Sequence, residues 1–262
     1  TGPTTPGQDS KQPFVIPVTM GLLSRDGQAL PLQLAGSAET LPQQTLVLTE
    51  ASASYTFVNI DSEPVPSLLR GFSAPVVLDD GLSTAELLCL LAHDSDPFNQ
   101  WEAGQRLMLQ SAVQALTQDS AGPVLSDELV AALRNVLRHP ELDAAFKDLA
   151  LTLPSENYIA DQLSVVDPQR VHAVREAMRL QLATALQADW QWAWDAHKNN
   201  GAYSPDAQSS GRRALAGLAM GMLCIAAVQT GDVVTTGRVY QQFKDASNMT
   251  DRFNALSALV VS

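Results

Sequence analysis

The sequence predicts a multidomain protein in which a small antiparallel β-sandwich, residues 1–80, precedes an α-helical array of solenoid type, residues 81–262. Up to Asp80 the apolar residues form short runs interrupted by Pro, Gly and Asp, a pattern typical of strands and turns. From Ser83 onward apolar residues recur with helical spacing. The 262 residues, of which 45% are hydrophobic, are sufficient for two ordinary domains with their own cores.

The strand candidates are short apolar or alternating runs. They cover residues 14–20, 29–34, 45–49, 54–60 and 67–78. Asp26-Gly27 lies between the first two runs, and Gly tolerates the positive φ that a tight hairpin turn requires. Tyr55 and Phe57 alternate with Thr56 in the fourth run. Because no helical period separates these runs, we expect an antiparallel sandwich of immunoglobulin-like type.

The helical part begins at a capping box, in which the Ser83 and Glu86 side chains satisfy free backbone donors. Asp96-Pro97 and Asp167-Pro168 each place a cap residue before a proline at the first helical position. The predicted helices start at residue 83 and then cover 97–116, 126–138, 141–151, 168–194, 214–228, 233–244 and 250 to the end. Short turns between them predict a solenoid-like array, but no strict period supports an established repeat family.

Composition and charge exclude several classes of function. The 16 Lys and Arg against 28 Asp and Glu give a net charge of -12, which would repel a phosphate backbone, so nucleic acid is not an expected partner. The apolar run 214–228 is shorter than the ~20 residues that span a bilayer. It therefore predicts a buried core helix, and we expect no membrane span.

The expected location is the cytoplasm. Residues 1–11 have neither the basic segment nor the apolar segment of a signal peptide. Cys89 and Cys224 lie far apart inside apolar helical stretches, which predicts two buried free thiols and fits a reducing compartment.

No metal site is predicted. A zinc-peptidase site requires His-Glu-x-x-His, two imidazoles one helical turn apart with a Glu that activates water, and none of the four histidines begins that motif. His172 and Glu176 share a helix face and could supply two ligands, but an exposed polar pair is the favoured interpretation. Residues 93–96, His-Asp-Ser-Asp, also gather ligand types, yet Asp96 before a proline is better explained as a helix cap.

Nucleophilic and phosphate-binding chemistry has no local signature either. There is no Gly-x-Ser-x-Gly, and no motif that pairs a nucleophile with a base is recognised around Cys89 or Cys224. Gly217 and Gly221 are not followed by Gly-Lys-Ser/Thr, so they predict close packing of helices rather than a phosphate loop. Accordingly no catalytic residue is assigned, and the residues that bind a substrate are left unknown.

Three tryptophans near one tyrosine could form a surface that stacks against a sugar or a peptide. Trp190 and Trp194 are spaced at i and i+4, so they share a helix face. Core packing is therefore the favoured interpretation of this pair, with Trp192 on the other side of the helix and Tyr203 in the following segment.

Several segments together resemble the bacterial aminopeptidase N family, the alanyl aminopeptidases among the gluzincin zinc peptidases. They are residues 13–18, 21–23, 66–76, 92–107, 210–215 and 248–252. The block from Ala92 to Leu107, with AHDSDPFNQWEAGQRL, is the longest of them, and the resemblance spans nearly the whole chain.

The resemblance implies a fragment without catalytic residues. In that family an N-terminal β domain and a zinc-binding catalytic domain precede a β-sandwich and a helical domain that caps the active site. This sequence resembles the sandwich without its first strand or strands, followed by the first part of the helical domain. The family's Gly-x-Met-Glu-Asn motif is absent, as is the zinc motif, so zinc is expected only in the missing catalytic domain.

The favoured hypothesis is a non-catalytic scaffold and lid portion of a zinc aminopeptidase that removes N-terminal residues from peptides. Its expected partners are the catalytic domain, the remaining C-terminal helices of the same polypeptide and the parent's peptide substrates. The alternative is a stand-alone α-solenoid that binds other proteins. A third hypothesis is an unrelated hydrolase whose site is assembled in space, for example around His172 or His93.

The last helix supports the idea of a truncated array. Residues 255–262 are apolar and contain no Gly, Pro or basic residue that would stop a helix. Such a helix needs a partner to cover it, so we expect the array to be truncated at its C-terminus.

Overall fold

The computed structural model describes residues 2–118, 122–198 and 201–260. The chain forms two compact units, residues 1–103 and residues 104–262. The division falls inside helix α2 (Pro97–Thr117), and each unit has its own set of packed elements.

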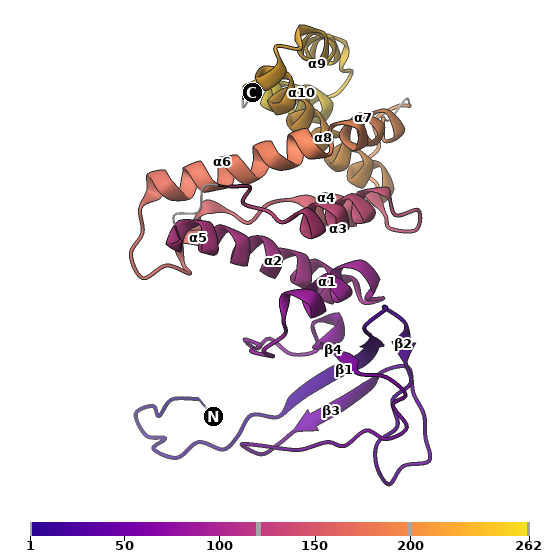
Figure 1. Ribbon diagram of the computed structural model, residues 1–262, viewed down its shortest axis with the longest axis vertical. Helices are drawn as coiled ribbons and strands as arrows, with labels where there is room; N and C mark the ends of the chain where they lie inside the picture. Colours follow the sequence, from indigo (N-terminus) through magenta and orange to yellow (C-terminus); the bar gives the residue numbers. More distant parts are fainter. Residues whose placement is uncertain (1, 119–121, 199–200, 261–262) are drawn as a thin grey trace. The chain divides into compact units, whose positions relative to one another are not determined.

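The first unit is built on one antiparallel sheet whose central strand is β1. Strands β1 (Ile16–Ser24), β2 (Ala29–Leu30), β3 (Gln44–Leu48) and β4 (Pro64–Leu68) form it, and β1 pairs with each of the other three (Figure 1). β3 pairs along the first half of β1, whereas β2 and β4 pair along its second half. The predicted hairpin turn is confirmed, with Gly27 at a φ of 84°.

The core of this unit lies on one face of the sheet. Met20, Leu22 and Leu46 project from β1 and β3 against Leu32, which is fully buried. Partly buried side chains from the sheet and from the connecting loops close this cluster; they are Leu30, Leu34, Phe57, Ile60 and Leu68. Irregular segments therefore supply much of the layer that covers the sheet.

The strand prediction for residues 54–60 is wrong. This segment forms a single bridge, between Leu34 and Phe57, because the backbone turns away at once. Asn59 takes a φ of 58°, which takes the backbone out of the extended conformation that continued pairing needs. Phe57 still packs on the core, so the alternation of apolar residues marked a buried position but not a strand.

Two other strand candidates were too long. The predicted run 29–34 contains only the two residues of β2, followed by a bridge between Leu32 and Leu41. The predicted run 67–78 ends as a strand at Leu68 and continues as a short 3-10 helix, η1 (Arg70–Phe72). Leu69 and Gly71 both take positive φ values there, which breaks the extended conformation.

Helix α1 (Thr84–His93) completes the first unit together with the first turns of α2. The predicted capping box is confirmed: Ser83 Oγ accepts from the Glu86 amide, and Glu86 Oε2 accepts from the Ser83 amide. α1 packs beside β4. The buried Asn99 of α2 donates to Ser67 Oγ of β4 at 2.8 Å, which fixes the start of α2 on the sheet.

The second unit is an all-helical array. Its helices after α2 are α3 (Asp127–Arg138), α4 (Ala144–Leu151), α5 (Glu156–Ala160), α6 (Pro168–Ala185), α7 (Gln187–Ala196), α8 (Ala207–Thr230), α9 (Val233–Asp245) and α10 (Met249–Val260). Side-chain caps define most of the starts; for example, Ser126 accepts from Leu129 N and Asp167 accepts from Gln169 N and Arg170 N.

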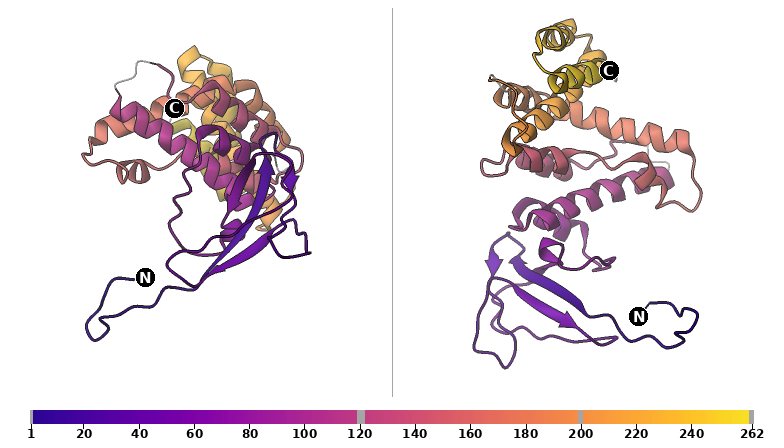
Figure 2. Two further views of the ribbon diagram at one scale, coloured as in Figure 1. Left: turned by 60° about the horizontal axis from the view of Figure 1, so that its bottom comes forward. Right: turned by 180° about the vertical axis from the view of Figure 1, so that it is seen from behind.

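Helix α8 is the centre of this array. It packs against α4, α6, α7, α9 and α10, and Figure 2 shows α9 and α10 beside it at the yellow end of the chain. By length and composition alone α8 could cross a membrane, but 61% of its apolar window is buried inside the protein. That burial is what the predicted core helix requires. The helix starts at residue 207 rather than 214 because Asp206 caps it through Ser209 N.

Three helix predictions need correction. α4 starts three residues later than expected, because Asp143 caps it by accepting from Phe146 N. α5 was not predicted, although Ser155 provides an ordinary cap for it. The single helix predicted over 168–194 is two helices that meet at Leu186.

The break at Leu186 has a long-range cause. Arg134 of α3 donates its guanidinium to the Ala185 carbonyl at 3.0 Å, so this carbonyl is satisfied outside the helix. The apolar spacing through Leu182, Leu186 and Trp190 continues across the break, and all three side chains are fully buried. Periodicity alone therefore could not reveal it.

Both cysteines are buried free thiols, as predicted. Cys89 donates weakly to the Ser24 carbonyl at 3.5 Å. Burial raises the pKa of the Cys89 thiol, and the Asp94 carboxylate raises it further. Cys89 is therefore held as an unreactive thiol in the core of the first unit.

Candidate functional site

The His93-Asp94-Ser95-Asp96 segment forms a structural corner between α1 and α2. Asp96 Oδ1 accepts from the Asn99 amide at 3.0 Å, which confirms its predicted role as a helix cap. Its other oxygen accepts from the Gly71 amide at 2.8 Å. The His93 ring lies directly over Gly27, where an added Cβ would come within 2.2 Å of it.

A buried ion pair holds this corner to the sheet. The Arg70 guanidinium donates to Asp94 Oδ1 at 3.0 Å, and only 10% of the Arg70 side chain and none of the Asp94 side chain is exposed. Asp94 Oδ1 also accepts from the Asp96 amide. Arg70 comes so close to Gly21 of β1 that a Cβ there would lie 2.5 Å from the guanidinium. Two segments that carry the family resemblance, 66–76 and 92–107, therefore meet in one network.

The pair of His172 and Glu176 does not converge on one point. His172 Nδ1 lies 2.8 Å from a Glu156 oxygen of α5. Glu176 instead lies within 3.7 Å of Arg175 and within 3.6 Å of Arg179. The two side chains therefore take different partners, and both are substantially exposed.

These residues do not fit a zinc site. Across the described ranges, no three His, Cys, Asp or Glu side chains gather closely enough to hold a metal ion. The carboxylates of Asp94 and Asp96 already accept hydrogen bonds from Arg70 and from backbone amides. No step of metal-assisted hydrolysis can be derived from this part of the chain.

The tryptophans divide as their spacing predicts. Trp190 and Trp194 are 0% and 1% exposed and pack in the core, where their indole nitrogens donate to the Leu182 carbonyl and to Gln242. Trp192 lies on the other side, with the Arg138 guanidinium 4.3 Å and the Lys147 ammonium 5.7 Å from its ring.

Tyr203 belongs to a separate contact. The Arg213 guanidinium lies 4.6 Å from its ring. Among the described residues no ring contact links Tyr203 to a tryptophan. The four aromatic residues therefore do not form one stacking surface.

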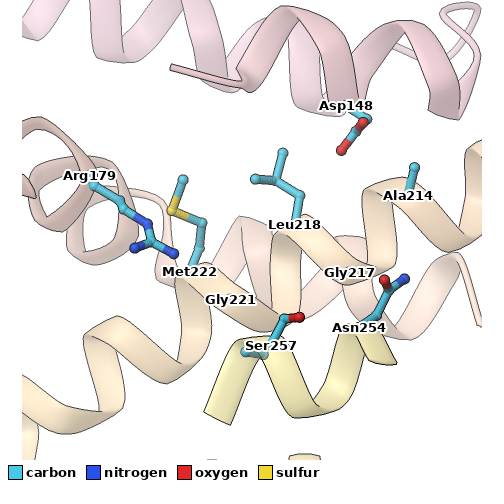
Figure 3. A pocket seen from close by; sticks show the side chains of 10 residues that line it. Asp148, Arg179, Ala214, Gly217, Leu218, Gly221, Met222, Asn254 and Ser257 are labelled. Atoms are coloured by element: carbon cyan, nitrogen blue, oxygen red, sulfur yellow. The ribbon is translucent and has the colours of Figure 1, made fainter. Parts of the chain in front are cut away.

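Gly217 and Gly221 of α8 differ in what surrounds them. An added Cβ at Gly217 would lie 2.9 Å from the Asn254 amide nitrogen of α10, so this glycine permits the close helix packing that its spacing predicts. At Gly221 an added Cβ would meet nothing within 4 Å. Both glycines line a pocket of about 330 Å³ between α4, α6, α8 and α10 (Figure 3).

The pocket combines an apolar floor with two charged walls. Leu218 and Met222 rise from α8 into it, while Asp148 of α4 points toward it from one side and Arg179 of α6 lies at the other end (Figure 3). Asn254 and Ser257 of α10 add polar atoms. The volume falls within the range of small-molecule sites, about 300–1,000 Å³.

Asp148 is the exceptional residue of this pocket. No hydrogen bond or ion pair reaches its carboxylate within the described parts of the chain, and burial raises the pKa of this carboxyl group. The sequence did not indicate Asp148, because the pattern of an amphipathic helix predicts that a single acidic residue faces solvent. Only the contact of α4 with α8 places it in a pocket.

Two family models match the chain. Residues 1–81 match one described as a domain of unknown function with an Ig-like fold, DUF3458, and residues 84–262 match another, DUF3458_C, described by ARM repeats. The expectation that no established repeat family applies is therefore wrong. The helices of this part differ in length, from five residues in α5 to 24 in α8, so they do not impose a strict sequence period.

Curated relatives and a solved structure point the same way. The chain is 33% identical over 262 residues to aminopeptidase N of Escherichia coli strain K12. This match covers 99% of this chain and 29% of that protein. It is 34% identical over 244 residues to aminopeptidase N of Caulobacter vibrioides, and this match covers 92% of this chain and 26% of that protein. The structure of Legionella pneumophila aminopeptidase A in complex with aspartic acid matches with a TM-score of 0.77 at 25% identity, over 94% of this chain and 28% of that one.

The chain thus spans less than a third of the length of these relatives. The Ig-like part and the helical part are matched in the same order as in the fold described above. At the corner of Arg70 and Asp94, two of the resembling segments pack on each other. By its family models this chain belongs to the DUF3458 and DUF3458_C domain families, and its relatives show that it is homologous to the C-terminal region of aminopeptidase N.

Proposed function

We propose that this chain is a non-catalytic scaffold and lid portion of a longer zinc aminopeptidase, and that zinc and the hydrolytic residues belong to the rest of that polypeptide. One observation carries the proposal: 99% of the chain matches 29% of an aminopeptidase N, while the described residues contain no group of three His, Cys, Asp or Glu side chains that could hold a metal ion. Its contribution is therefore one of shape and position.

The exposed apolar surface of α9 and α10 supports a role within a larger polypeptide. Met249, Phe253 and Val260 of α10 are 84%, 61% and 73% exposed, and Val233 and Val234 at the start of α9 are 78% and 68% exposed. These side chains lie on two helices that pack against each other, and exposed apolar side chains that gather in one patch mark contact with another protein surface. We infer that further parts of the same polypeptide cover it. Residues 261 and 262, at the end of the predicted apolar segment, lie outside the described residues.

A complementation experiment tests this role. The remainder of the parent polypeptide is expressed without this segment, and its cleavage of short peptides is compared with its cleavage of the N-terminus of a folded protein. We expect the segment-free protein to lose its discrimination between the two substrates, and the added chain to bind it and restore that discrimination. Unchanged discrimination without the segment would contradict the lid role, and capture of other partners alone would favour the stand-alone module.

A further inference from the structure

We propose that the pocket around Asp148 binds a small molecule that carries a primary ammonium group on a short apolar chain. This inference concerns only the second unit and does not depend on the proposed function.

Asp148 brings an unpaired charge to the pocket in the described parts of the chain. Asp148 is partly buried, and no side chain or backbone group in the described parts of the chain compensates its carboxylate. Removing a carboxylate from water without a partner costs free energy. A cationic ligand would recover that cost, and an ammonium group is a compact cation with three donors.

The described residues that line the pocket do not supply a counter-charge for the Asp148 carboxylate. Arg179 is the one basic residue that lines the pocket. Its guanidinium lies 3.6 Å from the Glu176 carboxylate on its own helix, and no ion pair joins it to Asp148. The side of the pocket near Asp148 therefore carries uncompensated negative charge.

Helix α10 supplies polar atoms to the pocket wall. Asn254 donates its side-chain nitrogen to the Arg213 carbonyl at 3.2 Å, so its side-chain oxygen remains as an acceptor on the pocket wall. The Ser257 hydroxyl lies on the same wall (Figure 3). These oxygens can receive ammonium protons that the carboxylate does not take.

The floor of the pocket suits the alkyl part of such a ligand. Leu218 and Met222 form an apolar floor, and the absence of a side chain at Gly221 leaves space beside them. A thioether is flexible and polarisable, so Met222 can adapt to an alkyl group. A short alkyl chain fits this floor better than a second charged group.

The test is a titration of the whole chain with n-pentylammonium, followed through the methyl signals of ¹³C-labelled methionine. We expect saturable shifts of the Met222 methyl. Asp148→Asn, which has the same shape without the charge, should weaken binding about tenfold or more. Gly221→Leu should abolish binding, because an added Cβ at this pocket-lining position meets nothing within 4 Å and the larger side chain would take up space in the pocket.

The matched control is Glu128→Gln, which removes one negative charge from the same unit at an exposed position outside the pocket. The affinity of this variant for n-pentylammonium should equal that of the unmodified chain. A parallel titration with norleucine distinguishes two sources of the ammonium group. If norleucine binds more tightly than n-pentylammonium, the ligand is a free amino acid whose carboxylate reaches Arg179. If norleucine binds more weakly, the ligand is an amine without a carboxylate. Absence of shifts at Met222, or equal affinity of Asp148→Asn and the unmodified chain, would overturn the proposal.

Discussion

Replacing Asp94 with Ala is expected to lower the free energy of unfolding of the first unit by about 3–5 kcal/mol. The substitution leaves the Arg70 guanidinium, 10% exposed, without its carboxylate. It also removes the acceptor for the Asp96 amide at the corner between α1 and α2. An uncompensated charge in a buried position costs far more than the pair itself contributes. Urea denaturation followed by circular dichroism measures the loss.

The matched control is Glu63→Ala. Glu63 lies 2.6 Å from Arg25 in the same unit, but these side chains are 70% and 56% exposed. Such surface pairs contribute about 0–1 kcal/mol. A double replacement, Arg70→Met with Asp94→Leu, should cost less than Asp94→Ala alone because it leaves no buried charge. Equal effects of Asp94→Ala and Glu63→Ala would show that the corner does not depend on this pair.

Replacing Trp190 with Ala is expected to destabilise the helical unit by about 3–5 kcal/mol. Its side chain is completely buried, and its indole nitrogen donates to the Leu182 carbonyl of α6 at 3.0 Å. The substitution creates a large cavity beside the junction of α6 and α7. Thermal and urea unfolding of the variant measure the change.

Trp192→Ala on the same helix is the control. Its partly buried ring contacts the Arg138 and Lys147 cations, and such contacts contribute about 0.5–1 kcal/mol each where they are exposed. We expect less than half of the loss seen for Trp190. Similar losses for the two variants would contradict the division between a core face and an outer face of α7.

Local sequence signals predicted the parts of the fold that depend on local chemistry. The capping box at Ser83, the Asp-Pro starts at residues 96 and 167 and the stop at Gly231 all lie where the structure has helix ends. At Ser83, Asp96 and Asp167 a side chain satisfies backbone groups within a few residues, whereas Gly231 ends α8 with a φ of 69°, from which its amide donates to the Ala227 carbonyl. The order of an Ig-like part and a helical part followed from them.

Features that depend on distant contacts could not be predicted in this way. The break at Leu186 depends on Arg134 of another helix. The segment around Phe57 looks like a strand, but its backbone turns at Asn59. The predicted domain boundary after residue 80 stays a prediction; the compact units divide at residue 103, because α1 and the first turns of α2 pack on the sheet through contacts such as Asn99 with Ser67.

The candidate site shows the same distinction. Sequence spacing drew attention to His172 with Glu176, which take separate partners. It passed over Asp148, whose importance arises from the approach of α4 to α8 and from the missing side chain at Gly221. Gly217 packs closely against Asn254 of α10, as predicted, whereas Gly221 has open space beside it in the pocket.

Peptide cleavage by the purified chain in the presence of zinc is the most direct measurement of the central claim. The chain is incubated with zinc and an alanyl chromogenic substrate, with and without a chelator. The account predicts no turnover in either case, because the described residues offer no set of metal ligands. Turnover that the chelator abolishes would contradict it.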